Sequence, residues 1–443
     1  MRHKGVAFCA AFAVVVVLAA PAAGGALAAP AGVQVNEVTR WNRIAVETLV
    51  LGLPGPAGGA PPASQINMGM TQGAVYDAVN SIKPRHQPYL LQTRFDRRAS
   101  KEAAAATAAY RVLTNIVSTV PATIPVPNRE TLLQTLATEY AASLGAIPDG
   151  RSKTAGIAAG NAAADAMITA RQGDGRFGPS QWVPNDDPGH WQPLANPGGT
   201  LILDPTPWAG GVDPFLLKSS SQFRTDGPRK LTSGAWARDF NEVKALGSAN
   251  STVRTPDQTH IARFWQSNPV KTWNEVARNL AEDAKYDVDL ADSALLFGMM
   301  NLAAADASIN CWNDKYYWDF WRPWNAIPRA DEDGNPATEP DPSWTALITA
   351  PYPDHPSGHL CLDGSHLRVL QMFFGTDKIR FGVTSIPFPG EIRYFDRFSA
   401  PIKEIIEARI WAGLHYRTAD VQAQKLGRNV VKYMAKHYFQ PLH

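Results

Sequence analysis

The chain of 443 residues has few charges and almost no net charge. Only 19% of its residues are charged, and the formal net charge is +2. Residues 1–28 contain Arg2 and Lys4 but no acid, so their removal leaves 40 basic and 40 acidic residues. Such a balance lacks the electrostatic footprint of proteins that bind nucleic acid or anionic membranes. The 45% hydrophobic content is typical of a soluble globular protein, and the chain is long enough for two domains or for one large two-lobed domain.

Long apolar runs are scarce after residue 28. The longest candidate, Ala294–Ala305, contains Asn301 and is shorter than the roughly 20 residues that a membrane-spanning helix needs. We therefore expect no integral membrane association once the N-terminal segment is removed.

The first 28 residues have the order of a secretory signal peptide. Arg2 and Lys4 precede an apolar stretch over Val6–Ala20, and Ala26–Ala28 fits the small-residue rule for cleavage. An uncleaved anchor is the alternative, but the apolar stretch is short for a membrane span. We predict cleavage near Ala28 and a secreted, extracellular protein.

Cysteine is rare. Of three cysteines, Cys9 lies in the predicted signal, which leaves Cys311 and Cys361. In an oxidising compartment these two could form a disulfide, but buried cysteines are often plain thiols. The sequence leaves both alternatives open.

Alternating strand patterns are also scarce, so we predict an all-α fold. Apolar residues recur at helical spacing, and alanine-rich stretches such as 101–112 have high helix propensity. The predicted helices cover residues 37–52, 66–82, 99–118, 128–145, 151–172, 232–246, 255–285, 287–318, 358–374, 391–413 and 418–438.

Two long segments, 174–215 and 326–356, interrupt the helical pattern and are rich in proline. Loops of this length are usually functional or disordered, and the tryptophans in 174–215 argue against disorder. The loops either line a pocket mouth or wrap a helical core. A Gly/Ser/Asn-rich stretch near residue 250 divides a predicted N-terminal helical region, 29–250, from a C-terminal bundle, 251–443.

Three short segments near the C-terminus supply the parts of an oxyanion site: Lys315–Pro323, Pro356–His359 and Arg409–His415. Together they offer three cations, a hydroxyl, a glycine amide and two imidazoles. Arg409 follows Ile402 by seven residues on an apolar helical stripe, so its guanidinium is predicted to point at the core. There it needs a carboxylate or a bound anion.

The other two segments add donors. Ser357, Gly358 and His359 precede a predicted helix whose N-terminal amides suit an oxyanion, although an ordinary N-cap is the plain alternative. Lys315 and Arg322 are seven residues apart and share a face if their helix continues to residue 321, where Pro323 would end it.

In order and spacing, these segments resemble the signature of a superfamily that unites type 2 phosphatidic acid phosphatases, bacterial class A acid phosphatases and vanadium-dependent haloperoxidases. The Trp-Asp-Phe-Trp-Arg-Pro run that ends at Pro323 resembles the haloperoxidase branch. So do Tyr352–His355 and Pro188–Pro193.

The resemblance implies two four-helix bundles packed together, with a vanadate site in the C-terminal one. His415 would be the metal ligand, His359 the catalytic acid and base, and the cations would neutralise the vanadate oxygens. The implied site residues are Lys315, Arg322, Ser357, Gly358, His359, Arg409 and His415.

The implied function is a secreted haloperoxidase that uses hydrogen peroxide to oxidise bromide or chloride to a hypohalous equivalent, with a small organic acceptor. A homo-oligomer is compatible with this reading. Two alternatives stay open: a secreted acid phosphatase that forms a phospho-histidine at His415, and a non-catalytic oxyanion-binding protein.

The third segment departs from the family pattern. Ala408 replaces a serine, and Asp420 lies one residue late. Either Asp420 still orients His415, or it is only a first-turn carboxylate and another group, such as a backbone carbonyl, orients the ring.

Four further residues receive interpretations. Tyr352 and His355 precede the serine-glycine-histidine segment, which favours pocket lining over a surface loop. His260 and Asp306 are interpreted as structural, and Asp306 should have a hydrogen-bond partner because it interrupts an apolar helix.

Overall fold

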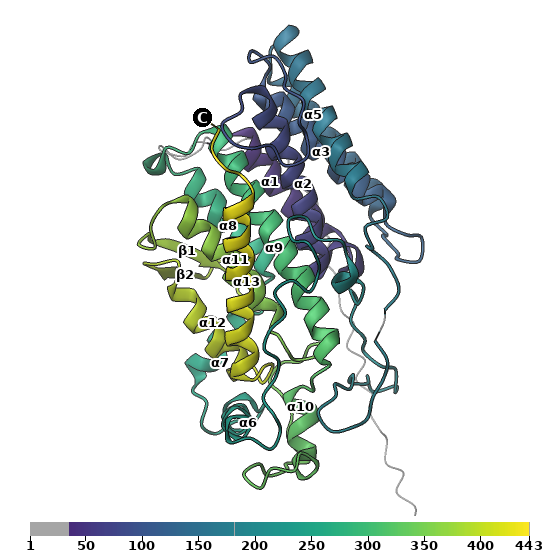
Figure 1. Ribbon diagram of the computed structural model, residues 1–443, viewed down its shortest axis with the longest axis vertical. Coiled ribbons are helices and arrows are strands. Elements are labelled where there is room, and N and C mark those ends of the chain that lie inside the picture. Colours follow the sequence, from purple (N-terminus) through teal and green to yellow (C-terminus); the bar gives the residue numbers. More distant parts are fainter. Residues whose placement is uncertain (1–34, 181, 443) are drawn as a thin grey trace, which may run out of the picture.

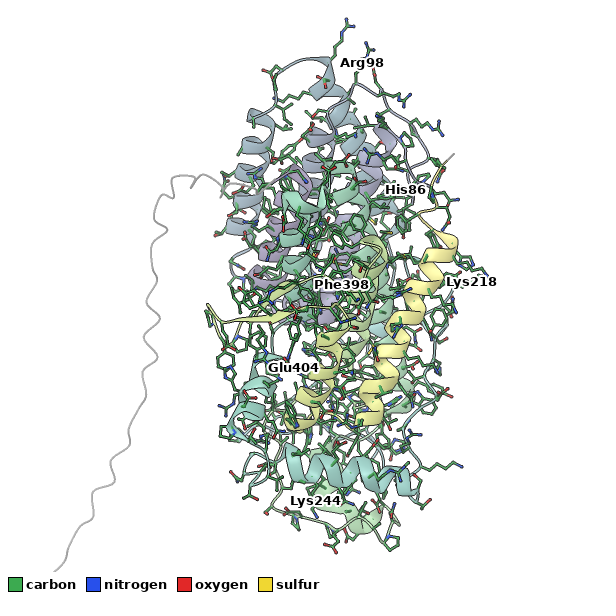
Figure 2. All side chains as sticks on the ribbon, turned by 90° about the vertical axis from the view of Figure 1, so that its left-hand side faces the viewer. His86, Arg98, Lys218, Lys244, Phe398 and Glu404 are labelled. Carbon is green, nitrogen blue, oxygen red and sulfur yellow. The ribbon has the colours of Figure 1, made fainter. Side chains whose placement is uncertain are left out.

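The computed structural model describes residues 35–180 and 182–442, so the predicted signal peptide lies outside the described residues. The molecule is elongated, with Arg98 near one end and Lys244 near the other (Figure 2).

Helices dominate the fold, as predicted. Those before residue 250 are α1 Glu37–Val46, η1 Glu47–Gly52, η2 Gly55–Gly59, α2 Pro61–Ile82, α3 Lys101–Thr119, α4 Arg129–Gly145, α5 Arg151–Ala170, η3 Ala209–Gly211 and α6 Gly234–Gly247.

The elements after residue 250 include one small sheet. They are α7 Pro256–Phe264, α8 Pro269–Ala281, η4 Ala284–Tyr286, α9 Leu290–Trp318, α10 Pro323–Ala326, η5 Ile327–Glu332, α11 Gly358–Phe373, β1 Phe381–Thr384, β2 Ile392–Phe395, α12 Ala400–Trp411 and α13 Arg417–His437.

Helix α9 is the central element (Figure 1). It packs against α2 of the N-terminal group, α2–α3–α5, and against α11 and α13 of the C-terminal group. All residues of α9 from Ser293 to Trp312 are buried. This burial explains why α9 itself carries apolar residues on every side. By length and composition α9 could cross a membrane, but its most apolar window is entirely buried inside the protein.

The predicted boundary near residue 250 falls in the connection between α6 and α7. The division into domains there stays a prediction.

Two predicted helices have different bounds in the structure. The predicted helix 391–413 begins only at Ala400, because Ile392–Phe395 pairs antiparallel with Phe381–Thr384. The pairing buries alternate β1 side chains, a gain that helical periodicity alone does not reveal.

The predicted helix 255–285 is two helices. It breaks before Pro269, and the Asn268 side chain caps α8 by accepting from the Val270 amide at 2.9 Å. Proline is favourable at the first position of a helix, so Pro269 is a sequence signal for the start of a second helix.

Candidate active site

The first segment turns sharply after α9. The helix ends at Trp318, and Asp319 adopts a left-handed conformation with φ 43°. The helix ends where the predicted range 287–318 ends and does not continue to residue 321, so the condition under which Lys315 and Arg322 would share a helical face is not met. Pro323 begins α10 instead of ending α9, and Arg322 is its N-cap residue. The turn still leaves both cations fully buried.

Lys315 ties the first segment to the second. Its Nζ donates to the carbonyl oxygens of Pro353 at 3.0 Å and Asp354 at 3.1 Å, and also to that of Pro356. Burial lowers the pKa of Lys315 to about 8. The ammonium therefore acts mainly as a fixed charge, since its three donors already have acceptors.

The two arginines keep donors without acceptors. Arg322 donates from Nε to the Tyr352 carbonyl at 2.9 Å and from Nη1 to the Leu414 carbonyl at 2.6 Å. Arg409 donates from Nη1 to the Trp265 carbonyl at 3.0 Å. Among the described residues, Arg322 Nη2 and Arg409 Nε are buried without a partner, and Arg409 has no ion pair. These are the donors that a bound anion would require.

The second segment starts α11. Ser357 is its N-cap, but its hydroxyl makes no capping bond and no hydrogen bond of normal geometry among the described atoms, and the side chain that interacts with it is the buried carboxyl of Asp420. A Cβ at Gly358 would lie 3.0 Å from the Trp312 ring, so this close packing favours glycine. The orphaned amides of the first helical turn lie at the same end.

His359 is only half-buried, and its Nε2 lies 3.3 Å from the Ser267 carbonyl. Burial, followed by the charge of Arg409, lowers the pKa of His359 well below its ordinary value. The imidazole is therefore neutral near pH 7 and able to accept a proton.

His415 follows the turn at Gly413, which has φ 72°, after α12. Its Nδ1 lies 2.8 Å from Asp354 Oδ1, and its Nε2 lies 3.2 Å from Arg322 Nη1. Burial and the nearby cations lower the pKa of His415 well below its ordinary value. A neutral ring that donates from Nδ1 to a carboxylate keeps its lone pair on Nε2, as a metal ligand requires.

The partner of His415 is thus Asp354, which lies in the stretch Tyr352–His355 but received no role from the sequence. Its carboxylate is 1% exposed, and burial raises its pKa to about 7. Asp420 is also fully buried, but no hydrogen bond joins it to His415 among the described residues. It lies in the first turn of α13 near Ser357 and Arg409, and burial raises its pKa well above its ordinary value. Two features of the sequence were the available signal: Asp420 lies one residue later than in the family pattern, and Asp354 lies two residues before the segment Pro356–His359.

Both long loops reach this site. Asp319 accepts from Trp182 Nε1 at 3.1 Å and lies 3.0 Å from His190 Nδ1, so the loop 174–215 is fastened to the turn after α9. Backbone bonds from Trp191 and to Gly189 reinforce the contact. The loop 326–356 supplies the carbonyls that hold Lys315.

The interpreted residues divide as follows. Tyr352 lies against the cradle, with its ring 5.2 Å from both Lys315 Nζ and the Arg322 guanidinium. His355 is 1% exposed and bonds to Thr225 at 2.9 Å, so it is not a surface residue.

The two residues interpreted as structural have structural partners. Asp306 accepts from the backbone amides of Phe215, Leu216 and Leu217 at 2.6–2.8 Å. His260 lies 2.9 Å from Glu391. Cys311 and Cys361 are both free buried thiols, which decides the alternative that the sequence left open.

The structure places the predicted site residues in one region, since Arg322, Lys315, Arg409 and His359 all lie near enough to His415 to lower its pKa. We call Lys315, Arg322, Ser357, Gly358, His359, Arg409 and His415 the cradle. Its buried donors from Arg322, Ser357 and Arg409 are groups that would bind the oxygens of an oxyanion, and His415 Nε2 would be its ligand nitrogen. The described residues include no cluster of three or more His, Cys, Asp and Glu that could hold a metal ion, so a metal here would depend on the oxyanion set and one imidazole.

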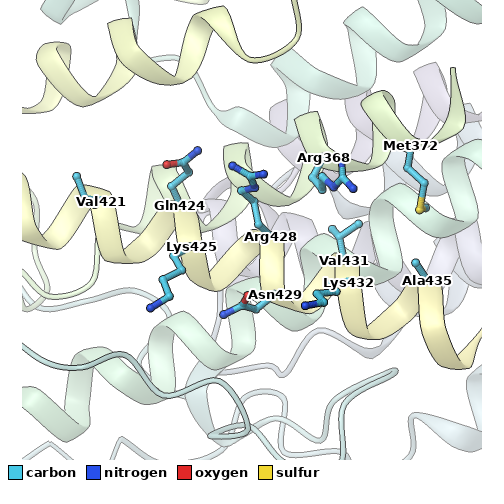
Figure 3. Close-up of a pocket in the computed structure, with 10 residues that line it drawn as sticks. All are labelled: Arg368, Met372, Val421, Gln424, Lys425, Arg428, Asn429, Val431, Lys432 and Ala435. Atoms are coloured by element: carbon cyan, nitrogen blue, oxygen red, sulfur yellow. The ribbon is translucent and has the colours of Figure 1, made fainter. Parts of the chain in front are cut away.

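A second cationic region lies on the outer face between α11 and α13, with a volume of about 560 Å³. Arg368, Lys425, Arg428 and Lys432 lie along it, and all four are exposed (Figure 3). We call this region the outer groove. It shares no residue with the cradle.

Comparisons with known proteins agree with this geometry. Residues 295–443 match the family model described as the VCPO second helical-bundle domain. The chain is 26% identical over 416 residues to vanadium chloroperoxidase from Curvularia inaequalis, covering 76% of this chain and 66% of that protein.

Solved structures share the fold. A bacterial vanadium-dependent iodoperoxidase aligns with TM-score 0.72 and 23% identity, covering 91% of this chain and 97% of that one. A holo-type bacterial vanadium-dependent chloroperoxidase aligns with TM-score 0.67 and 17% identity, over 91% and 97%. The C-terminal bundle thus matches the domain model, and the chain as a whole is similar in sequence to a vanadium chloroperoxidase and in fold to bacterial vanadium-dependent haloperoxidases.

Proposed function

We propose that this protein is a secreted vanadium-dependent haloperoxidase, which oxidises halide with hydrogen peroxide to a hypohalous equivalent. The observation that carries the proposal is the set of buried, unpartnered donors from Arg322, Ser357 and Arg409 around a neutral His415. Burying an unpaired donor costs roughly 1–3 kcal/mol, more for a charged group, so an oxyanion ligand would relieve that cost.

The cradle would hold vanadate through complementary charge. Arg322 and Arg409 would donate to its oxygens, Lys315 would contribute charge at close range, and the Ser357 hydroxyl would add a further bond. His415 would supply Nε2 as the ligand, held in place by Asp354. Bound vanadate would supply a Lewis acid that activates hydrogen peroxide.

His359 is the residue placed to move protons. Neutral and half-buried, it can accept a proton from incoming peroxide and return it to the departing oxygen. In the overall reaction, hydrogen peroxide, halide and one proton give hypohalous acid and water, so peroxide is reduced and halide is oxidised.

The experiment runs two assays on the same mature protein. One supplies orthovanadate, hydrogen peroxide and bromide, with a halogenation reporter. The other supplies a phosphomonoester without vanadate. Vanadate-dependent halogenation is the expected result. Phosphate release that vanadate inhibits would instead assign the cradle to a phosphatase, and vanadate binding without either activity would indicate an oxyanion-binding protein.

His415→Ala sharpens the assay. Loss of the ligand nitrogen should abolish halogenation, while Arg428→Ala in the outer groove serves as the control for handling and folding. Halogenation that survives His415→Ala would remove this residue from the proposed site.

A further inference from the structure

The outer groove is formed by two helices that expose cations and no acid. Helix α11 contains one acid, Asp363, and α13 contains one, Asp420, and both carboxyl groups are buried. The four cations of the groove are exposed. Because the sequence after residue 28 carries equal numbers of basic and acidic residues, this face concentrates charge of one sign.

Most of this charge is not neutralised within the protein. Three of the groove cations make no ion pair with any residue that the structure describes: Arg368, Arg428 and Lys432. The fourth, Lys425, has its Nζ 3.9 Å from Asp226 Oδ2, and the two side chains are 70% and 84% exposed. An ion pair so exposed contributes little, so the groove keeps its positive charge.

The two helices that form the groove are in close contact, and their spacing is fixed. A Cβ at Gly364 of α11 would lie 2.8 Å from the Gln424 carbonyl oxygen, and a Cβ at Gly427 of α13 would clash with the Cys361 carbonyl oxygen. Glycine at both positions therefore lets the two backbones approach each other. A groove with fixed walls is already formed before a partner binds, which lowers the cost of ordering.

Apolar side chains lie among the cations. Met372 of α11 is half-buried, Ala435 is exposed and Val421 is 48% exposed, and all three line the groove. Among the described residues, no aromatic side chain lines it. Proteins that bind single-stranded nucleic acid stack bases on aromatic rings, so this lining disfavours such a partner. It suits a partner that is both apolar and acidic.

The cations have a spacing that a second helix can match. Lys425, Arg428 and Lys432 are three and four residues apart, which separates them by about 4.5 and 6 Å along the axis of α13. In Figure 3, Arg428 extends from α13 on the side of Arg368, whereas Lys425 and Lys432 extend from its other side. A helix that lies along α13 has the same rise per residue, so acids at this spacing would meet the cations.

We propose that the outer groove docks an acidic amphipathic helix of a partner protein. The groove runs from Val421 to Ala435, about 21 Å along α13, or four turns of such a helix. The apolar stripe of the partner helix would cover the apolar side chains, and its acids would pair with the cations, as in other helix-in-groove complexes. The docking does not depend on the proposed function, because the groove shares no residue with the cradle.

The probe is a synthetic peptide of about 18 residues, long enough to cover the groove as a helix. Leucines at i, i+3, i+4 and i+7 form its stripe, and glutamates flank them. Fluorescence anisotropy of the labelled peptide with the protein should give a Kd of about 100 μM at low salt. Binding should weaken at least about fivefold at 0.2 M salt, because exposed charges are screened. Circular dichroism should show the peptide gaining helix on binding.

Charge reversals in the groove test which residues bind the peptide. Arg428→Glu and Lys432→Glu each replace an attraction by a repulsion at an exposed position, so each should weaken binding about 5- to 20-fold. Arg151→Glu is the matched control, since it reverses an exposed helical cation on α5, in the N-terminal group. It should leave the Kd unchanged. Val421→Ser removes an apolar contact and should weaken binding about twofold.

Two further probes distinguish a helix from any polyanion. A scrambled peptide of the same composition has the same charge but no apolar stripe, and should bind at least about tenfold more weakly. Polyphosphate carries charge alone. Absence of peptide binding, equal binding of the scrambled peptide, tighter binding of polyphosphate, or a Kd unchanged in both charge reversals would overturn the proposal.

Discussion

The cradle and the outer groove carry similar numbers of cations in opposite settings. The cradle buries Lys315, Arg322 and Arg409 within the core, whereas the four cations of the outer groove are exposed. Interactions between charges near 4 Å are several-fold stronger near a protein surface than in bulk water, and stronger again inside. Burial and fixed hydrogen bonds, not the count of charges, therefore make the cradle the candidate site.

The largest expected effect on the difference between the cradle and the outer groove comes from removing a buried cation. Arg409→Ala deletes a guanidinium whose Nε has no partner and whose Nη1 holds Trp265. Charged hydrogen bonds contribute about 1.5–3 kcal/mol, and a buried charge more, so we expect vanadate affinity to fall about 100- to 1000-fold. Calorimetric titration of the apo protein with orthovanadate measures it. A change below threefold would contradict the cradle assignment.

The next effect comes from the residue that holds the ligand imidazole. Asp354→Ala removes the acceptor for His415 Nδ1–H, so vanadate affinity should fall about 10- to 100-fold, as for other groups that orient a metal ligand. Asp354→Asn keeps an acceptor oxygen and should recover most of this loss. Nitrogen-15 NMR of the His415 ring should show Nδ1–H in the wild type and a mixture of tautomers in Asp354→Ala. An unchanged ring spectrum would exclude the positioning role.

Buried carboxylates near the cradle provide a pH test. Burial raises the pKa of Asp363 to about 7, while its Oδ1 accepts from Trp273 Nε1 at 2.6 Å. Because the folded pKa lies above the unfolded value, this contribution to stability is present below about pH 4 and is lost as pH rises towards 7. Asp363→Asn should remove a decline on the order of 1–2 kcal/mol between these pH values, since relaxation reduces the cost of a buried charge.

Urea unfolding at pH 4 and pH 7 measures this difference, with Asp396→Asn as the matched exposed control. Asp396 has 76% of its side chain exposed. Equal pH dependence in the wild type and Asp363→Asn would show that Asp363 is not the titrating group.

The smallest effect is expected in the outer groove. Arg428→Ala removes a cation of the same type as Arg409, but an exposed one, so we expect stability to change by less than about 0.5 kcal/mol and vanadate affinity to stay the same. A loss of vanadate affinity comparable to that of Arg409→Ala would end the distinction between the two regions.

Local sequence patterns predicted most of this fold. Most helices lie within a few residues of their predicted bounds, because apolar spacing directly reflects which face is buried. The errors concern tertiary pairing. Nothing local announced that residues 392–395 pair with 381–384, and the left-handed Asp319 that ends α9 is stabilised by distant partners, Trp182 and His190.

The sequence predicted which residues make up the site, but it did not predict the residues that hold them in position. The seven cradle residues were predicted from their types, their spacing and the resemblance that these carry, and their roles stay a prediction. The partner of His415 was missed, since Asp354 is 61 positions away and only the folded chain shows which carboxylate the ring meets. The same holds for Asp204, which lies 108 positions from Trp312 and accepts a hydrogen bond from its Nε1.

Lys315 has one further consequence. Its ammonium is bound by three carbonyl oxygens of the segment before α11, so the charge that would face the anion also closes the chain around it. These bonds therefore fix the segment before α11 and position the Lys315 charge at the same time. A molecule in which the segment 353–356 has come away from α9 would lose the segment's geometry and the position of the Lys315 ammonium together.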